Sequence, residues 1–201
     1  MSRILAGRGK GRWLKSPTGE ATRPTGVRVR QTLFDILAPE VPGCRFLDAF
    51  AGNGGVGLEA LSRGAAKVVL VDRSRAAIAA IRENLRALAG GPGEAQVFHQ
   101  DARTALDALS DRGLRFDIVY LDPPYASDAY ESMLSLVGSG PLLAEGGLVV
   151  AEHFHKRALP ERMGTLVRTR TARVGDHCLS FYRRRDGSTD AKPRGAGGET
   201  P

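Results

Sequence analysis

The sequence predicts an α/β protein whose sheet is mostly parallel and ends in an antiparallel hairpin. Through the middle of the chain, short apolar runs of strand length alternate with segments of helical periodicity, a pattern typical of parallel sheets with helices on both faces. Near the carboxyl end, extended runs at 165–174 and 178–184 are separated by Gly175 and Asp176, turn residues that favour a closing hairpin. A chain of 201 residues is long enough for one well-packed domain with small additions.

Apolar runs and turn residues place the individual elements. Ser74 can cap a helix in which Ile78, Ile81 and Leu85 recur at helical spacing, and the Gly-Gly-Pro-Gly segment 90–93 ends it. The same reasoning predicts strands at 45–50, 67–72, 96–100, 116–121 and 147–152, and further helices at 56–62, 103–109 and 130–137.

Charge is distributed unevenly along the chain, whose formal net charge is +7. Residues 1–30 hold eight Lys and Arg against one Glu, residues 31–155 are net acidic, and residues 156–185 are strongly basic again. Basic segments that flank an acidic middle favour a polyanion such as nucleic acid as the partner. The alternative is an ordinary solvated surface that happens to be basic.

The two ends of the chain differ from its middle. Residues 1–25 are expected to form a small basic β-hairpin, in which the single tryptophan, Trp13, is expected to lie in the core rather than to stack on RNA. Residues 26–185 are expected to form the main domain. It begins with a helix over 27–37 whose buried side is Val29, Leu33, Phe34 and Leu37. Residues 186–201 are rich in Gly, Pro, Thr and charge, which predicts a disordered tail.

The composition also leads to expectations about metal binding, membrane spans and the cellular compartment. Cys44 and Cys178 lie far apart and in no metal-binding motif, so we expect two reduced core thiols and no metal. The sequence has no apolar run long enough to span a bilayer, and its first residues do not resemble a signal peptide. We therefore expect a cytoplasmic protein without membrane contact, and a monomer.

A glycine-rich turn follows the first predicted strand of the main domain. Residues 52–57 read Gly-Asn-Gly-Gly-Val-Gly, a spacing typical of nucleotide-binding turns, although a tight turn without a ligand is the alternative. Asp48 precedes this turn and would repel a pyrophosphate, so a ligand with positive groups, such as S-adenosylmethionine, suits the site better. Asp72 can accept hydrogen bonds from ribose hydroxyls. NAD has such hydroxyls too, so Asp72 does not distinguish NAD from S-adenosylmethionine. Asp101 can accept from an adenine amino group or can serve only as a helix N-cap.

The motif Asp122-Pro123-Pro124-Tyr125 directly follows the fourth predicted strand. Two prolines stiffen the backbone and remove two N–H donors, so a carboxylate and backbone carbonyls remain as acceptors beside an aromatic ring. Such acceptors suit a substrate with an exposed NH₂ group: Asp122 and the Pro123 carbonyl can each accept one amino hydrogen while Tyr125 stacks on the planar base. The alternative is a proline-rich loop with a capping Asp.

This motif resembles the catalytic motif of methyltransferases that modify exocyclic amino groups of bases, and residues 46–65 resemble their cofactor motif. The fuller resemblance, over about residues 3–184, is to the RsmD-type 16S rRNA guanine-N2 methyltransferases. It includes Arg3-Ile-Leu-Ala, Gly11-Arg, Thr22-Arg-Pro-Thr, Arg28-Val and Leu33-Phe. Two departures stand out. Gly26-Val27 replaces a commonly polar or acidic pair, and the second strand of the main domain ends in Asp72 where the family often has Glu.

The resemblance implies a class I methyltransferase fold, which is Rossmann-like, with a mostly parallel seven-stranded sheet. It implies S-adenosylmethionine as the cofactor and methylation of a guanine N2 at position 966 of 16S rRNA in the small ribosomal subunit. The residues expected to bind the cofactor are Asp48, Ala49, Phe50, Ala51, Gly52, Asn53, Gly54, Gly57, Asp72, Arg73, Asp101 and Ala102. The expected catalytic residues are Asp122, Pro123, Pro124 and Tyr125, and the residues expected to contact RNA are Arg3, Arg8, Lys10, Arg12, Arg23 and Arg28.

Other functions remain open from the sequence. A DNA adenine or cytosine amino-methyltransferase could use the same motif, although the chain has no separate target-recognition domain. A non-catalytic ribosome assembly factor could retain the fold, although the intact Asp48, Asp72 and Asp122 favour catalysis. A dinucleotide oxidoreductase is disfavoured by Asp48.

Overall fold

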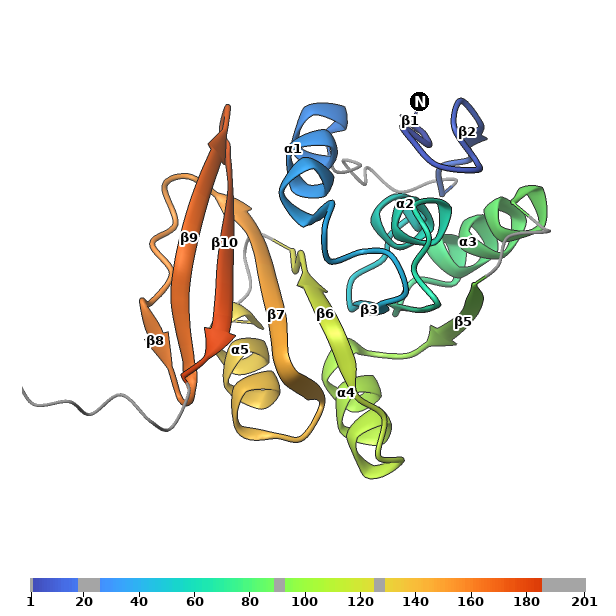
Figure 1. The fold of residues 1–201 in the computed structure, drawn as a ribbon. Helices are drawn as coiled ribbons and strands as arrows, with labels where there is room; N and C mark the ends of the chain where they lie inside the picture. Colours follow the sequence, from blue (N-terminus) through green and yellow to red (C-terminus); the bar gives the residue numbers. More distant parts are fainter. Residues whose placement is uncertain (1, 18–25, 89–92, 125–128, 186–201) are drawn as a thin grey trace, which may run out of the picture.

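The computed structural model describes residues 2–17, 26–88, 93–124 and 129–185. Within these residues, one eight-stranded sheet carries helices on both faces, and a two-stranded hairpin lies beside it (Figure 1). The hairpin strands are β1 (Ser2–Arg3) and β2 (Trp13–Leu14). The sheet strands are β3 (Arg45–Asp48), β4 (Lys67–Asp72), β5 (Glu94–His99), β6 (Phe116–Leu121), β7 (Leu143–Phe154), β8 (Arg162–Met163), β9 (Leu166–Val174) and β10 (His177–Arg184). The helices are α1 (Val27–Leu37), α2 (Gly55–Ser62), α3 (Arg75–Ala87), α4 (Ala102–Asp111) and α5 (Ala129–Ser139).

The strand order confirms the predicted fold class. Across the described sheet the order is β5-β4-β3-β6-β7-β10-β9-β8, and β3 to β7 pair in parallel. The last strands run antiparallel, because β10 pairs with both β7 and β9 in that sense. Seven of the eight strands of this sheet were predicted from the sequence. The short edge strand β8 was not predicted, since a two-residue strand carries no periodicity in the sequence.

Most predicted elements are confirmed, with differences at their ends. The helix over 27–37 has the predicted bounds, and Ser74 caps α3 by accepting a hydrogen bond from the Ala77 amide at 3.2 Å. The fifth strand of the parallel set is twice as long as expected. It runs from Leu143 to Phe154, because β6 pairs with its beginning and β10 pairs with its end.

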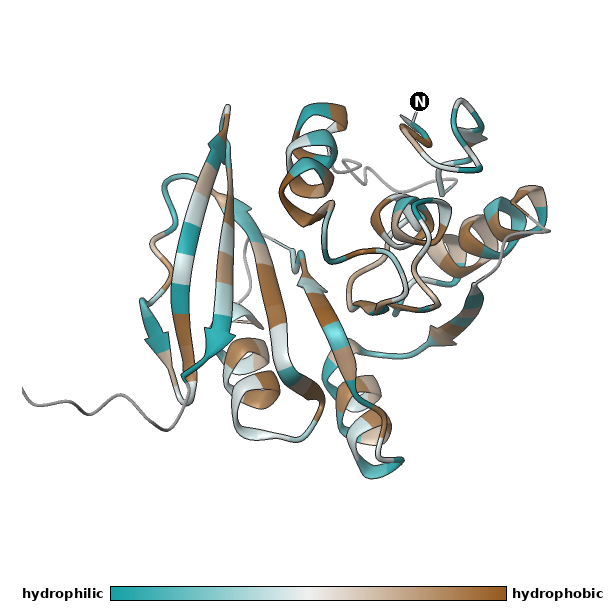
Figure 2. Cartoon of the chain, viewed as in Figure 1, coloured by the Kyte–Doolittle hydropathy of each residue, from teal (hydrophilic) through white to brown (hydrophobic). Residues whose placement is uncertain are grey.

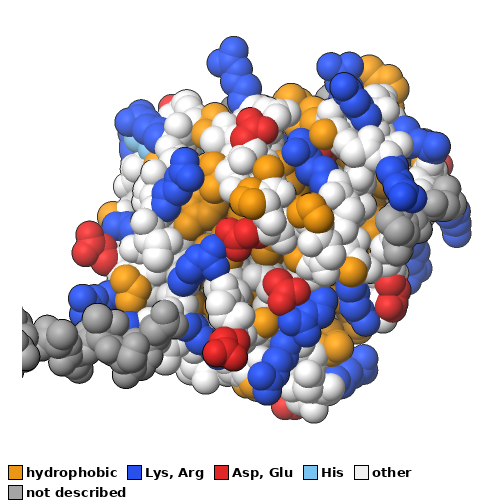
Figure 3. All heavy atoms as spheres, viewed as in Figure 1, with side chains coloured by type: hydrophobic (Ala, Val, Ile, Leu, Met, Phe, Trp, Pro, Cys, Tyr) orange, Lys and Arg blue, Asp and Glu red, His pale blue; other side chains and the backbone are white. Residues whose placement is uncertain are grey.

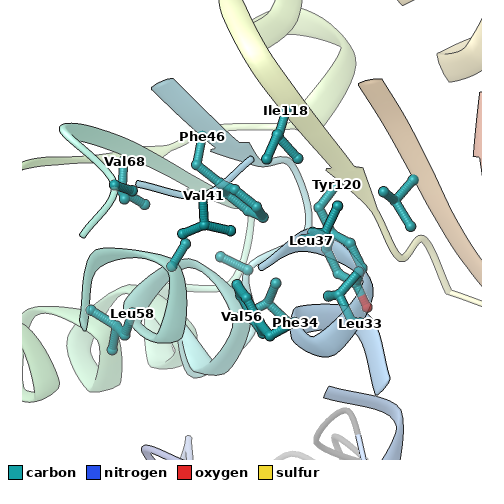
Figure 4. Close-up of a cluster of buried hydrophobic side chains, with 14 of the residues drawn as sticks. Leu33, Phe34, Leu37, Val41, Phe46, Val56, Leu58, Val68, Ile118 and Tyr120 are labelled. Atoms are coloured by element: carbon teal, nitrogen blue, oxygen red, sulfur yellow. The ribbon is translucent and has the colours of Figure 1, made fainter. Parts of the chain in front are cut away.

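Two apolar cores lie on the two faces of the sheet. Successive strand residues alternate between them, as in Phe46 and Leu47 of β3. The side chains of α1, α2 and α3 fill one core, and those of α4 and α5 fill the other. Figure 2 shows hydrophobic stretches on β6 and β7 and on the helices that cover the sheet. Phe34 of α1 stacks on Phe46 with ring centroids 6.3 Å apart, close to Tyr120 (Figure 4).

The N-terminal hairpin is fixed to α1, α2 and α3 by buried polar contacts. Arg30 of α1 is fully buried and donates to Ser2 Oγ at 2.8 Å and to the Arg3 carbonyl at 2.6 Å. Glu59 of α2 accepts from the Leu5 and Ala6 amides at 2.7 and 3.0 Å. On α3, Asn84 Oδ1 accepts from the Lys15 amide at 2.8 Å. The hairpin therefore has one face anchored against the main domain.

The prediction that Trp13 lies in the core is wrong: the residue is 63% exposed. Trp13 pairs with Arg3 across the hairpin, while the neighbouring pair, Ser2 and Leu14, is buried. A strand presents alternate residues to opposite faces, so a two-stranded hairpin with one docked face leaves the other face in solvent. Trp13 lies on that outer face.

Three further predictions concern the thiols, the membrane and the tail. Cys44 and Cys178 are buried and free, as expected. Among the described helices, none is long and apolar enough to cross a membrane. The expected disordered tail, 186–201, lies outside the described residues.

Candidate active site

The candidate site lies where the parallel strands end. Asp48 and Asp72 are the last residues of β3 and β4, Asp122 directly follows β6, and Glu152 lies near the end of β7. In open α/β sheets, ligands bind beyond the carboxyl ends of the strands. The fold thus brings together, at one edge of the sheet, carboxylates that are more than a hundred residues apart in the sequence.

Asp48 is a buried carboxylate with one oxygen still available. It is 1% exposed, and its Oδ2 accepts a hydrogen bond from the Gly57 amide at 3.0 Å. Its Oδ1 is also buried and has no hydrogen-bond partner among the described residues. Burial raises the pKa of the Asp48 carboxyl to about 7, opposed by the Gly57 amide. A cationic ligand would supply the missing partner, so the ammonium of S-adenosylmethionine fits this oxygen.

The glycine turn leaves room for a ligand and allows close packing behind it. Gly52 has φ +54°, and a Cβ built on it would meet nothing within 4 Å in the described structure. At Gly57, by contrast, a Cβ would lie 2.9 Å from Leu70 Cδ2, so only glycine lets α2 pack this closely on β4. Asn53 is buried, and its Nδ2 lacks a hydrogen-bond partner among the described residues. The turn therefore has both space and an available donor.

Asp72 holds the turn and the next helix in place. Its Oδ2 accepts from the Gly52 amide at 2.7 Å and its Oδ1 accepts from the Ser74 amide at 2.8 Å. The side chain is partly exposed, and each carboxylate oxygen has a second lone pair. Asp72 can thus orient the glycine turn and still accept from ribose hydroxyls.

Asp101 is the N-cap of α4 in the structure. Its Oδ1 accepts from the Arg103 amide at 2.9 Å, while the side chain remains exposed and Ala102 is buried. The capping role left open by the sequence is therefore realised. A cap of this kind uses only part of the acceptor capacity of the carboxylate.

The remaining predicted cofactor residues lie along the same segment. The backbone of Ala49 donates to the Tyr120 carbonyl at 3.1 Å, and that of Ala51 donates to the Val71 carbonyl at 2.9 Å, which ties the turn to β6 and β4. Phe50 is half-buried and Arg73 is exposed. Gly54, with φ +82°, is the N-cap of α2.

Asp122 and Pro123 form an acceptor pair beside these carboxylates. Burial, the charge of Glu152 and the charge of Asp48 raise the pKa of the Asp122 carboxyl well above its ordinary value. The Tyr130 hydroxyl lies 2.9 Å from the Glu152 carbonyl and 3.4 Å from the Pro123 carbonyl, within hydrogen-bonding distance of both. A carbonyl oxygen has two lone pairs, so the Pro123 carbonyl retains acceptor capacity toward a substrate.

Glu152 is the functional candidate that the sequence analysis missed. It is 1% exposed, its carboxylate accepts from the Tyr120 hydroxyl, and its Oε1 lies 2.8 Å from His177 Nδ1 of β10. The predicted strand 147–152 ended at this residue, so its position at a strand end was the available signal. Its influence on Asp122 depends on the fold, because the two residues are 30 positions apart.

Two predicted site residues, Tyr125 and Arg23, lie outside the described residues. Pro124 is described and exposed. Among the residues that the structure describes, no three His, Cys, Asp or Glu side chains are arranged to hold a metal ion.

The predicted RNA-contacting residues of the described chain are at the surface. Arg3, Arg8, Lys10 and Arg12 of the hairpin region are exposed, and so is Arg28 of α1. Figure 3 shows several Lys and Arg side chains on the visible face of the molecule, over the region where Figure 1 places the hairpin. The neighbouring Arg30 is different, because it is buried and anchors the hairpin.

The strand order and the site together are those of a known class of enzyme. The Thermus thermophilus 16S rRNA N2 methyltransferase RsmC, solved with AdoMet and guanosine, is 25% identical to this chain with a TM-score of 0.66. That alignment covers 84% of this chain and 45% of the other. The fold is that of the class I methyltransferases, and the cofactor of this class is S-adenosylmethionine.

The family is shown by matches along nearly the whole chain. The family model described as Conserved hypothetical protein 95 matches residues 2–183. "Putative rRNA methyltransferase YlbH" of Bacillus subtilis is 40% identical over 183 residues, which are 91% of this chain and 99% of that protein. "Ribosomal RNA small subunit methyltransferase D" of Escherichia coli is 35% identical over 190 residues, 94% and 93% of the two chains. The chain belongs to this family of RsmD-type methyltransferases.

Proposed function

We propose that this protein methylates the exocyclic N2 of a guanine in 16S rRNA of the small ribosomal subunit, at position 966 by family resemblance. The observation that carries the proposal is the acceptor pair Asp122 and Pro123, set at a strand end beside the buried Asp48. The names of the relatives support ribosomal RNA as the substrate. RsmC, solved with guanosine, supports a guanine in a site of this class.

One group of residues would bind the cofactor, and a second group would bind the target base. Asp48, the glycine turn, Asp72 and Asp101 would hold S-adenosylmethionine, which supplies an electrophilic methyl group when bound. Asp122 and the Pro123 carbonyl would each accept one amino hydrogen of the target base, which points the nitrogen lone pair away from these acceptors. Holding two reactants in line can contribute ~7–11 kcal/mol to catalysis. The stacking role predicted for Tyr125 remains part of this proposal.

Proton release after transfer needs no dedicated base in this scheme. The methylated nitrogen would be positively charged and strongly acidic, so it would lose its proton readily to a solvent water molecule. An unpaired loop base suits the site, because RNA readers usually target splayed bases and base-modifying enzymes take them out of the stack. The exposed Arg3, Arg8, Lys10 and Arg12, together with Arg23 and Arg28, would hold phosphates of the RNA.

Methyl transfer from labelled S-adenosylmethionine tests the proposal. The substrates are small subunits from cells that lack this protein, naked 16S rRNA and duplex DNA. We expect label in the ribosomal RNA, loss of label with Asp122→Asn, and no loss with Asp107→Asn, a matched change at an exposed residue of α4. Label in DNA alone would support the DNA methyltransferase instead. RNA binding without label in any substrate would support the assembly factor.

A further inference from the structure

We propose that Trp13 is a stacking platform for an unpaired base of the bound RNA, at a place distinct from the site that receives the target guanine. The inference rests on the proposed function in so far as it takes RNA as the partner. It goes beyond that function because it assigns a second base-binding position, on the N-terminal hairpin.

The exposure of Trp13 is fixed by the docking of the hairpin. The inner face carries Ser2 and Leu14, and Arg30 holds Ser2 from within the main domain. Because Trp13 alternates with Leu14, its ring cannot turn inward without undoing those contacts. The backbone that carries the ring is therefore held in place by the main domain, so the hairpin need not be ordered on binding.

The surroundings of the ring favour an anionic partner with a planar group. The Arg3 guanidinium lies 6.0 Å from the centroid of the Trp13 ring, and Arg8, Lys10 and Arg12 are exposed on the same short segment. Residues 2–17 contain no Asp or Glu. A single exposed apolar side chain is ordinary at a protein surface, but a tryptophan on a short segment that carries several cations is suited to nucleotides, although Glu83 of α3 pairs with Lys15 of that segment. The cations can hold phosphates while the indole stacks on a base.

The chain contains one tryptophan, so fluorescence excited at wavelengths that tryptophan but not tyrosine absorbs reports on this residue alone. We expect a single-stranded RNA oligonucleotide to quench the emission as a base stacks on the ring. Inorganic polyphosphate is the control, because it can occupy the cations but has no base. It should leave the emission nearly unchanged at saturating concentration.

Variants of the full chain separate stacking from charge. Trp13→Ala should weaken binding of single-stranded RNA by about 5- to 100-fold, in line with the value of one base stack. Trp13→Phe should keep most of the affinity, and both variants should bind polyphosphate as the wild type does. Because Trp13 is exposed, neither change should lower the midpoint of thermal unfolding appreciably.

The results distinguish the failure of this inference from the failure of the proposed function. RNA that binds and is methylated without quenching, and with full affinity for Trp13→Ala, would overturn the stacking role alone. Quenching by isolated small-subunit proteins but not by RNA would also overturn it, and would indicate a protein partner. Absence of any RNA binding or methylation would overturn both the stacking role of Trp13 and the proposed function.

Discussion

Glu152 Oε1 lies 2.8 Å from His177 Nδ1, so a buried carboxylate of β7 contacts an imidazole of β10, and the same carboxylate accepts a hydrogen bond from Tyr120 of β6. The charge of Glu152 raises the pKa of Asp122, together with burial and Asp48. Tyr120 also faces this carboxylate, and its hydroxyl donates to it. Glu152 is therefore placed to set the pH at which Asp122 becomes an acceptor.

Replacing Glu152 by Gln should shift the acidic limb of the pH–rate profile to lower pH. In the proposed mechanism Asp122 accepts one amino hydrogen as an ionised carboxylate, and its raised pKa means that activity falls as the pH drops through that value. Without the neighbouring charge, the pKa of Asp122 falls and ionisation persists to lower pH. The measurement is kcat/KM against pH, with Glu145→Gln, an exposed site, as the control. An acidic limb that is unchanged in Glu152→Gln would show that Glu152 does not influence the ionisation of Asp122.

Cofactor affinity should depend on pH through Asp48. Because its pKa is about 7, the carboxylate is mostly protonated at pH 6 and mostly ionised at pH 8. A cationic ligand favours the ionised form, so the affinity for S-adenosylmethionine should rise over this range and binding should release a proton. Asp48→Asn should weaken binding by about tenfold or more and flatten the pH dependence. Calorimetry in buffers of different ionisation enthalpy would measure both; equal pH dependence in the variant would contradict the assignment.

The same carboxyl should destabilise the cofactor-free protein at high pH. A carboxyl whose folded-state pKa lies above its unfolded value of 3.8 keeps a proton that the unfolded chain has lost. The free energy of unfolding therefore decreases as the pH rises from about 4 to about 7 and stays lower above that, by at most about 4 kcal/mol. Relative to the wild type, Asp48→Asn should gain stability at pH 8 compared with pH 4. Urea unfolding at the two pH values tests this, and a constant difference between the proteins would refute it.

Arg30 should be essential for anchoring the N-terminal hairpin. Arg30→Met removes the bonds to Ser2 and Arg3 and the positive charge 3.9 Å from Glu59, which keeps its ion pair with Arg63 at 2.7 Å. A hydrogen bond to a charged group typically contributes ~1.5–3 kcal/mol to stability, so we expect a loss of this order. Thermal unfolding and limited proteolysis within residues 2–17 should both report the change, while Arg28→Met at the exposed neighbouring position should not. Equal protease resistance in the two variants would argue against the anchor.

Phosphate contacts by the hairpin should appear as salt dependence. Replacing Arg8, Lys10 and Arg12 together by Ala should lower the steepness of log affinity against log salt, by about 0.7 per lost contact for single-stranded RNA. These side chains are exposed, so the fold should be unaffected. Filter binding across a salt series measures the slope. A slope identical to that of the wild type would mean that the hairpin does not touch phosphates.

Features that depend on local sequence were predicted well. The spacing of Val29, Leu33 and Phe34 was sufficient for the bounds and the buried side of α1. Asp48 and Asp122 could be placed at strand ends because apolar runs stop directly before them.

Features that depend on pairing between distant segments were not predicted. The contact of Glu152 with His177 follows from the register of β7 and β10, which no local pattern encodes. The exposure of Trp13 depends on which hairpin face Arg30 holds, and Arg30 itself was not distinguished from the other basic residues. The roles of such residues can be recognised only from the tertiary contacts that determine whether each side chain is buried or exposed to solvent.

Methylation by this protein is tested most directly by mass spectrometry of nucleosides and of nuclease fragments of 16S rRNA, taken from small subunits that lacked the protein and were then treated with it and S-adenosylmethionine. We predict one new N2-methylguanosine, in the fragment that contains position 966, present with the wild type and with Asp107→Asn and absent with Asp122→Asn. A methylated adenine or cytosine, or N2-methylguanosine that persists with Asp122→Asn, would contradict the roles assigned to Asp122 and the Pro123 carbonyl.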